Sequence, residues 1–247
     1  MPRYLMLLSA LFLALILAVS CSDDEPTAPV PAIANVLLME DGGNEDSLYK
    51  ILDLANFDVT LGGPFQNYTG TDFSAYDLVI LLNGIDYTYE MPDSVETALK
   101  NYVSGGGVLL VTEWMCYTIY TFGYNRILDS ILPVESFGDS YGPVVETYLI
   151  EGNNAEINAI RAGVPDSFDT RATWSYSAVF TNPRSQLTNY TLIYSGVLAN
   201  TPALTMGTIG TGRVIHWSTA LEYEGVNIWS PEVRRLFINI AAFSKTI

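Results

Sequence analysis

The fold of this chain is decided by the stretch Gly105-Gly106-Gly107-Val108-Leu109-Leu110-Val111-Thr112-Glu113-Trp114-Met115-Cys116. Its three glycines end a helix, because glycine adopts the backbone conformation that closes a helix at little cost. Val108 to Val111 then form a short apolar strand, and a polar and aromatic segment follows at once. In an α/β sheet, ligands bind beside the carboxyl ends of the central strands. Glu113, Trp114 and Cys116 are therefore the first candidates for function.

Three further segments resemble this strand. Asn35 to Met39 and Tyr76 to Leu82 are largely apolar, which is typical of parallel strands covered on both faces, and Arg213 to Ser218 repeats the pattern near the end of the chain. Apolar residues at helical spacing follow Asn44 and again follow Pro92 and Pro231. The alternation predicts a doubly wound, mostly parallel α/β sheet with helices on both faces, of the flavodoxin-like or amidotransferase-like kind.

The second half of the chain is less regular and predicts a β-rich insertion. We expect its strands either to extend the sheet or to form a small flap. The predicted elements are helices over Tyr117 to Leu132, Asn154 to Arg161 and Pro231 to Phe243, and strands over Val144 to Ile150, Thr173 to Phe180, Thr191 to Ser195 and Ala203 to Ile209.

The amino-terminal segment predicts export. Arg3, an apolar run from Leu5 to Val19 and small residues before Cys21 have the pattern of a signal peptide over residues 1–20. The end of this run, Ala18-Val19-Ser20-Cys21, resembles the bacterial lipobox, which implies a lipidated Cys21 and anchorage to a membrane. An ordinary secretory signal with a chance cysteine is the alternative.

The lipobox is followed by an acidic and proline-rich tether over residues 21–34 and by a single domain over residues 35–247. Ser22-Asp23-Asp24-Glu25 is similar to the surface-export signals of Bacteroidetes-type lipoproteins, although a plain acidic tether has the same composition. We therefore expect the protein in the bacterial cell envelope, lipid-anchored in the outer membrane and facing either the periplasm or the cell exterior.

Charge and cysteine content narrow the partners. The chain has 11 Lys and Arg against 27 Asp and Glu, a formal net charge of −16. The surface would repel a polyphosphate backbone, so nucleic acid is excluded as a partner. With Cys21 lipidated, Cys116 is the one remaining cysteine of the sequence, which rules out an intramolecular disulfide.

The order of motifs resembles the class I glutamine-amidotransferase-like superfamily, and within it the ThuA-like (trehalose-utilisation-type) branch. The resemblance is carried by Val36 to Gly42, Tyr76 to Leu82, Gly105 to Thr112 and Gly212 to Ser218 with the closing helix. These are features of the framework, so they imply the fold more strongly than an activity.

The resemblance also implies where a catalytic triad would stand. Amidotransferases of the superfamily carry a cysteine nucleophile directly after the strand that corresponds to Val108 to Val111, and a histidine and an acid on a late strand. Here the nucleophile position falls near Thr112 or Glu113, and Cys116 lies further along the chain. His216 lies on the expected late strand, but the His-Pro-Glu continuation of the family is absent. Glutaminase activity is therefore not expected.

The loops at the carboxyl edge carry acids, amides and aromatic rings. Such side chains suit uncharged ligands rich in hydroxyl groups, because rings stack on sugars while carboxylates and amides bond to hydroxyls. The segment Asp41 to Asp46 lacks the spacing of an EF-hand, so no metal or other cofactor is predicted. The catalytic candidates are Glu113, His216 and Cys116; the ligand-binding candidates are Asp41, Asn44, Asn83, Asp86, Tyr87, Trp114, Tyr117, Trp217 and Glu222.

Three functions remain open at this point. The first is a non-catalytic domain that binds a carbohydrate or a surface protein. The second is a glycan hydrolase or lyase that uses Glu113 as acid or base, with His216 or Glu222 opposite. The third is a cysteine amidohydrolase that uses Cys116 and His216. Structural roles compete with each of these, namely a buried filler for Cys116, a core histidine for His216, and a helix cap or an arginine partner for Glu113.

Overall fold

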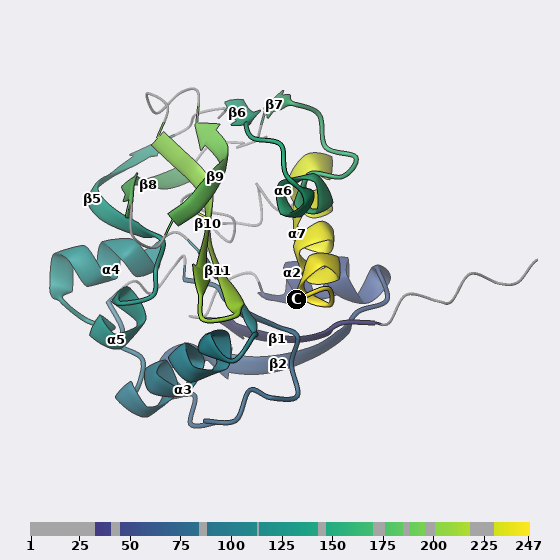
Figure 1. Ribbon diagram of the computed structural model, residues 1–247. Coiled ribbons are helices and arrows are strands. Elements are labelled where there is room, and N and C mark those ends of the chain that lie inside the picture. The colour runs from purple at the N-terminus through teal and green to yellow at the C-terminus, as the bar shows by residue number, and fades with distance from the viewer. Residues whose placement is uncertain are drawn as a thin grey trace, which may run out of the picture. The chain divides into compact units, whose positions relative to one another are not determined.

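Five parallel strands form one half of the sheet, and their carboxyl ends are where the sequence predicts a functional site (Figure 1). The computed structural model describes residues 33–40, 45–83, 88–112, 114–142, 147–169, 176–184, 188–195, 201–217 and 230–247. Its parallel strands are β1 (Asn35–Glu40), β2 (Asp58–Pro64), β3 (Leu78–Leu81), β4 (Val108–Thr112) and β11 (Gly212–Trp217). They lie in the order β2-β1-β3-β4-β11, and each neighbouring pair is parallel. This is the strand order of flavodoxin-like sheets, which confirms the predicted doubly wound fold.

The second half of the chain extends the same sheet in antiparallel fashion. The order continues from β11 through β10, β9 and β6 to β7. A separate antiparallel pair joins β5 to β8. The bounds of these strands are β5 (Val134–Gly142), β6 (Thr147–Ile150), β7 (Ser167–Asp169), β8 (Tyr176–Pro183), β9 (Thr188–Ser195) and β10 (Thr201–Ile209).

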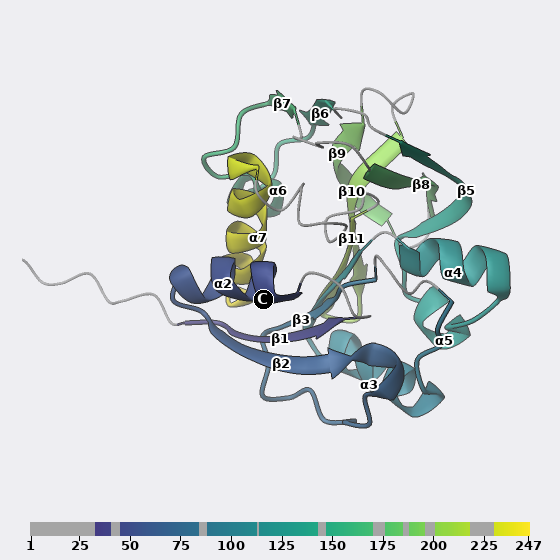
Figure 2. The same cartoon turned by 180° about the vertical axis from the view of Figure 1, so that it is seen from behind.

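Helices cover both faces of the parallel half (Figure 2). On one face lie α2 (Glu45–Leu54), α6 (Ala155–Ile160) and α7 (Pro231–Ser244). On the other face lie α3 (Asp93–Ser104), α4 (Trp114–Phe122) and α5 (Arg126–Asp129), and a short 3-10 helix, η1 (Phe65–Asn67), follows β2. Among the described helices, none is long and apolar enough to cross a membrane.

Alternate residues of each central strand enter two different cores. In β1, Val36 and Leu38 pack towards α2 and α7, whereas Leu37 and Met39 pack towards α3. This alternation explains why the strands have no polar face, because both faces are buried. All residues of both cores belong to the compact unit Ile33–Ile247, so we expect that unit to fold by itself.

Two local predictions differ from the structure. The single helix expected over Tyr117 to Leu132 is divided into α4 and α5, because Gly123 and Asn125 take positive φ angles of 75° and 52° that a helix does not allow. Strands β5 and β7 were not predicted. β5 contains Gly138, Asp139 and Gly142, residue types that are rare in strands.

Candidate functional site

Four buried polar residues stand where the apolar parallel strands end. Glu40 ends β1, Asn83 follows β3, Thr112 ends β4 and His216 is the next-to-last residue of β11. Their exposed fractions are 9%, 0%, 0% and 1%. Because the strands are parallel, these residues share the carboxyl edge of the sheet. We call them the strand-end cluster.

Hydrogen bonds fix the backbone of Asn83 between β3 and β4. The backbone N–H of Asn83 donates to Thr112 Oγ1 at 2.9 Å, and the Thr112 hydroxyl donates to the carbonyl of Leu81 at 3.2 Å. The N–H of Trp114, which begins α4, donates to the carbonyl of Asn83 at 3.1 Å. The backbone on both sides of the Asn83 side chain is therefore held in place.

The side-chain amide of Asn83, unlike its backbone groups, makes no hydrogen bond to the described residues. It is fully buried, yet neither Nδ2 nor Oδ1 has a hydrogen-bond partner among the described residues. A buried polar group without a partner costs about 1–3 kcal/mol of stability. Native proteins keep few such groups, so this amide beside the β1/β3 switch point marks a candidate site.

His216 lies deep in the sheet. It is paired with Val111 of β4 on one side and with Thr205 of β10 on the other. Thr205 is 1% exposed, and its hydroxyl also has no hydrogen-bond partner among the described residues. His216 and Thr205 therefore form a second buried polar position close to the carboxyl edge.

Cys116 is a buried residue of α4. Its side chain is 2% exposed, and burial raises the pKa of the thiol well above its usual range, while Arg184 lowers it and Asp129 raises it. Cys116 lines a cavity of about 260 Å³ together with the ion pair Arg184–Asp129, in which Nη2 and Oδ1 are 2.5 Å apart. A nucleophilic cysteine must ionise near neutral pH, and the groups that act on this thiol include no histidine. The arrangement favours a packing role for Cys116.

The aromatic candidates are divided between the two faces. Trp114 is 8% exposed and packs edge-on against Tyr117, with 5.0 Å between ring centroids. Trp217 is fully buried on the opposite face, where it stacks on Phe237 at 5.1 Å and its indole N–H donates to Tyr148 Oη at 3.3 Å. Trp114 belongs to the core on the α3/α4 face and Tyr117 packs against that core, whereas Trp217 belongs to the core under α7. Both Trp114 and Tyr117 lie at the start of α4, directly after the carboxyl end of β4.

The remaining candidates lie outside the described residues, and their predicted roles stay predictions. They are Glu113, Asp41, Asn44, Asp86, Tyr87, Glu222 and the lipidation site Cys21. Within the described part of the chain, no group of three or more His, Cys, Asp or Glu residues is arranged to hold a metal ion.

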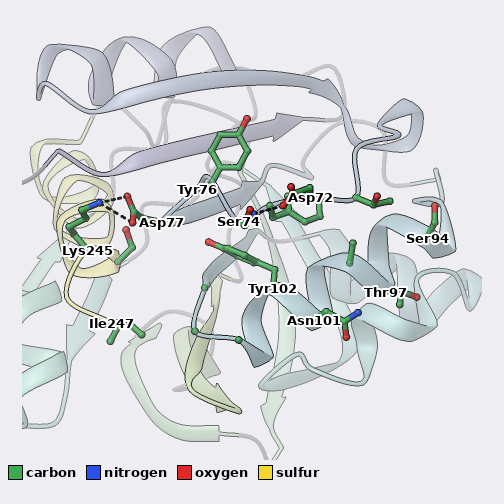
Figure 3. A pocket seen from close by; sticks show the side chains of 17 residues that line it. Asp72, Ser74, Tyr76, Asp77, Ser94, Thr97, Asn101, Tyr102, Lys245 and Ile247 are labelled. Carbon is green, nitrogen blue, oxygen red and sulfur yellow. Dashed lines mark hydrogen bonds and ion pairs between the residues drawn. The ribbon is translucent and has the colours of Figure 1, made fainter.

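A larger groove lies at the opposite, amino-terminal edge of the parallel strands (Figure 3). Its volume is about 810 Å³, and it was not predicted from the sequence. Its buried and half-buried polar groups include Asp77, Lys245 and Tyr102, and these three are engaged. Lys245 Nζ lies 3.0 Å from Asp77 Oδ2, which also accepts from the N–H of Asn35 at 2.9 Å. The Tyr102 hydroxyl bonds to both the N–H and the carbonyl of Val108 at 3.2 Å. The groove and the unsatisfied amide of Asn83 therefore lie at opposite edges of the sheet, and of the two, within the described part of the chain, only the amide leaves buried hydrogen-bonding groups for a ligand.

Comparison with known proteins identifies the fold. No protein-family model matches the chain, and no curated protein matches its sequence. Among solved structures, a cytoplasmic protein from Salmonella typhimurium LT2 superposes with a TM-score of 0.64 at 14% identity, over 84% of this chain and 98% of that one. A ThuA-like protein from Parabacteroides merdae gives a TM-score of 0.63 at 15% identity, over 87% of this chain and 90% of that one. The fold is ThuA-like.

This ThuA-like fold confirms the resemblance seen in the sequence at the level of architecture. It also occurs inside larger proteins. A cold-adapted β-galactosidase from Rahnella sp. R3 matches with a TM-score of 0.58 at 15% identity, over 84% of this chain but only 30% of the enzyme. At such identities the likeness shows the fold alone.

Proposed function

We propose that this ThuA-like domain is an exported, lipid-anchored protein that binds a carbohydrate at the carboxyl edge of its sheet and lacks amidotransferase activity. The observation that carries the proposal is the buried, unsatisfied amide of Asn83 beside the switch point of the sheet. A side-chain amide offers a donor and an acceptor together, which matches the hydroxyl groups of a sugar.

The neighbouring groups support a polar, uncharged ligand. Thr205 adds a buried hydroxyl without a partner among the described residues, and the Trp114–Tyr117 ring pair lies at the start of α4. Rings beside hydrogen-bonding groups are the usual composition of a sugar site. The occurrence of the fold within proteins named as β-galactosidases is consistent with this ligand class.

The same geometry argues against cysteine chemistry. Burial disfavours the thiolate of Cys116, which is the form that attacks a carbonyl carbon. A cysteine amidohydrolase would need the opposite shift in pKa. We therefore expect no release of ammonia from glutamine by the purified domain.

Binding is tested on a glycan array with residues 33–247, followed by calorimetric titration of the best ligand with two matched variants. Asn83→Leu removes the unsatisfied amide, and Asn101→Leu makes the same change on an exposed residue of α3 that lines the amino-edge groove. We expect Asn83→Leu to weaken binding at least about tenfold, because a site built around a polar group loses its hydrogen bonds, and Asn101→Leu to leave binding unchanged.

Two outcomes would contradict the proposal in different ways. If no glycan is retained, carbohydrate is the wrong ligand class and a surface protein becomes the better partner. If a glycan is retained and Asn83→Leu does not weaken its binding, the site lies elsewhere on the domain.

Anchorage is tested separately in the full chain. We expect the wild-type protein to incorporate a radiolabelled fatty acid and to sediment with membranes, and Cys21→Ser to lose the label. Equal labelling of the two proteins would show that Cys21 is not the acylated residue.

A further inference from the structure

Most cations of this acidic chain are engaged within the fold. Arg184 pairs with Asp129, Arg213 with Glu156, Lys245 with Asp77, and Arg161 with Asp166. Lys100 donates to Ser130 and Arg126 donates to the carbonyl of Gly123. Of the cations in the described part of the chain, only three make neither an ion pair nor a side-chain hydrogen bond: Lys50, Arg234 and Arg235.

These three cations line the same groove. Lys50 belongs to α2, and Arg234 and Arg235 belong to α7, which lies beside α2 on one face of the sheet (Figures 1 and 2). The groove between them has a volume of about 590 Å³, and we call it the α2/α7 groove. One carboxylate, Asp53, also lines it, so its local charge is positive while the whole chain carries −16.

The remaining lining of the α2/α7 groove is apolar. Ile51, Ala55, Pro231 and Ile238 contribute to it, and Leu54 stands at its side with 83% of its surface exposed. No other described large apolar residue is as exposed as Leu54. The α2/α7 groove therefore presents an exposed aliphatic side chain directly beside three cations that are free to bind an anion.

We propose that the α2/α7 groove docks onto the phosphate headgroups of an anionic lipid bilayer, with Leu54 entering the interface. Lys and Arg beside an exposed leucine are the combination found on protein surfaces that lie on membranes. The cations attract lipid phosphates, and the aliphatic side chain enters the boundary between headgroups and acyl chains.

The acidic remainder of the chain does not cancel this attraction. At physiological ionic strength, charges are screened beyond about 8 Å, so a membrane in contact with the groove senses mainly the residues that line it. Outside the groove, 26 acids stand against 8 cations in the sequence (27 − 1 and 11 − 3), so the rest of the chain attracts an anionic surface less. The α2/α7 groove therefore selects which side of the domain faces the bilayer. This inference does not depend on the carbohydrate site.

The test is flotation of residues 33–247 with vesicles of phosphatidylcholine alone or with about one third phosphatidylglycerol. Arg234→Gln/Arg235→Gln removes two groove cations, and Lys100→Gln/Arg126→Gln removes two cations from α3 and α5 with the same change in net charge. A third variant, Leu54→Ser, removes the apolar contact without affecting a core residue.

We expect the wild-type domain to float with the anionic vesicles, and less so at high salt. Arg234→Gln/Arg235→Gln should weaken this binding about 30-fold, because each cation near an anionic surface contributes about fivefold to the affinity. Lys100→Gln/Arg126→Gln should bind as the wild type does. Leu54→Ser should bind several-fold more weakly with the same dependence on salt.

Other results would overturn the proposal. Absence of wild-type binding to anionic vesicles would do so, as would equal losses in the two double variants. A parallel arm with polyglutamate checks for an acidic protein partner. If the groove variant loses polyglutamate binding while no variant binds vesicles, the α2/α7 groove serves a protein instead. A further arm measures binding of inorganic phosphate. If phosphate binds and Leu54→Ser leaves vesicle binding unchanged, the groove captures a free anion and Leu54 does not enter a bilayer.

Discussion

The two edges of the parallel sheet differ in how far their buried polar side chains are hydrogen-bonded. At the amino edge, Asp77 accepts hydrogen bonds from Asn35 and Lys245, and Tyr102 bonds to both backbone groups of Val108. At the carboxyl edge, the amide of Asn83 is fully buried and has no partner among the described residues. The groove of about 810 Å³ lies at the amino edge, whereas the buried amide without hydrogen-bond partners among the described residues lies at the carboxyl edge.

A second buried asparagine makes the difference concrete. Asn125, also fully buried, accepts from the N–H of Met91 at 2.8 Å and donates to Met115 Sδ at 3.2 Å. Asn125 therefore ties the segments before α3 and before α5 into the core. Asn83 has the same side chain and the same burial without these bonds. The comparison separates a polar residue kept for stability from one that we assign to binding.

The largest effect is expected at the amino edge, where backbone segments touch. A Cβ on Gly212 would lie 2.1 Å from the carbonyl oxygen of Val103 and 2.3 Å from that of Gly107. Gly212→Ala should therefore reduce the free energy of unfolding by about 4 kcal/mol, because backbone cannot yield as a side chain does. Urea denaturation measures the loss.

Gly163→Ala is the matched control for this prediction. Gly163 has a φ of +72° and no atom within 4 Å of the added Cβ, so only the backbone conformation opposes alanine there. We expect a loss of about 1 kcal/mol. If the two alanine variants lost the same free energy of unfolding, contact between backbone segments at Gly212 would not be the cause of the loss.

The next effect compares the two asparagines directly. Asn125→Leu leaves the buried N–H of Met91 without its acceptor and should cost about 2 kcal/mol. Asn83→Leu removes two unsatisfied groups and should leave the free energy of unfolding unchanged within about 0.5 kcal/mol, or raise it. Thermal denaturation of both variants checks this. A large loss for Asn83→Leu would mean that its amide supports the fold after all.

The smallest effect concerns Glu96 of α3. Its carboxylate is fully buried, and Oε2 accepts from the N–H of Leu128 at 2.7 Å, while Oε1 has no partner among the described residues. Burial raises the pKa of this carboxyl from its usual 4.5 to about 7; the bonds to Leu128 and Ile127 oppose the shift, and the nearby acids Asp93 and Glu90 add to it.

A raised pKa means that the folded state holds the proton more tightly than the unfolded state. The stabilising contribution of Glu96 to the free energy of unfolding is therefore fully present below about pH 4.5, and it declines as the pH rises towards about 7. The amide oxygen of Gln accepts a weaker hydrogen bond from Leu128 than the carboxylate does, which offsets part of the gain. We therefore expect the free energy of unfolding of Glu96→Gln to exceed that of the wild type by about 1 kcal/mol above about pH 7. Urea denaturation across this range checks the difference, and a gap that widened as the pH fell would have the wrong sign.

The sequence predicts the parallel strands well for a physical reason. Segments such as Leu78–Leu81 are buried on both faces and must be apolar at every position, so few other structures fit them. The break between α4 and α5 could also have been predicted from the sequence, because Gly123 and Asn125 are residue types that favour a positive φ. Strand β5 was not, because its pairing with β8 overrides the low strand propensity of its glycines.

The candidate site could be predicted only in part. Asn83, Thr112 and His216 meet at one edge because their strands are parallel, and the order of motifs indicates that much. Neighbouring residues of a strand point to opposite faces of the sheet, so Trp217 and His216 do not both face the same site, although both were predicted as candidates. Whether the Asn83 amide finds a partner depends on packing between distant segments, which no local pattern encodes.

The position of β11 has a consequence for the order of folding. This strand is inserted between β4 and β10, yet it follows β4 in the chain by about a hundred residues. Until it arrives, the apolar strand β4 is the edge of a half-built sheet and exposes a free row of backbone hydrogen-bonding groups. Closure of such a long loop is slow, and an unpaired edge of this kind can pair with another chain. We therefore expect a chain that ends before Gly212 to aggregate more readily than one that includes β11.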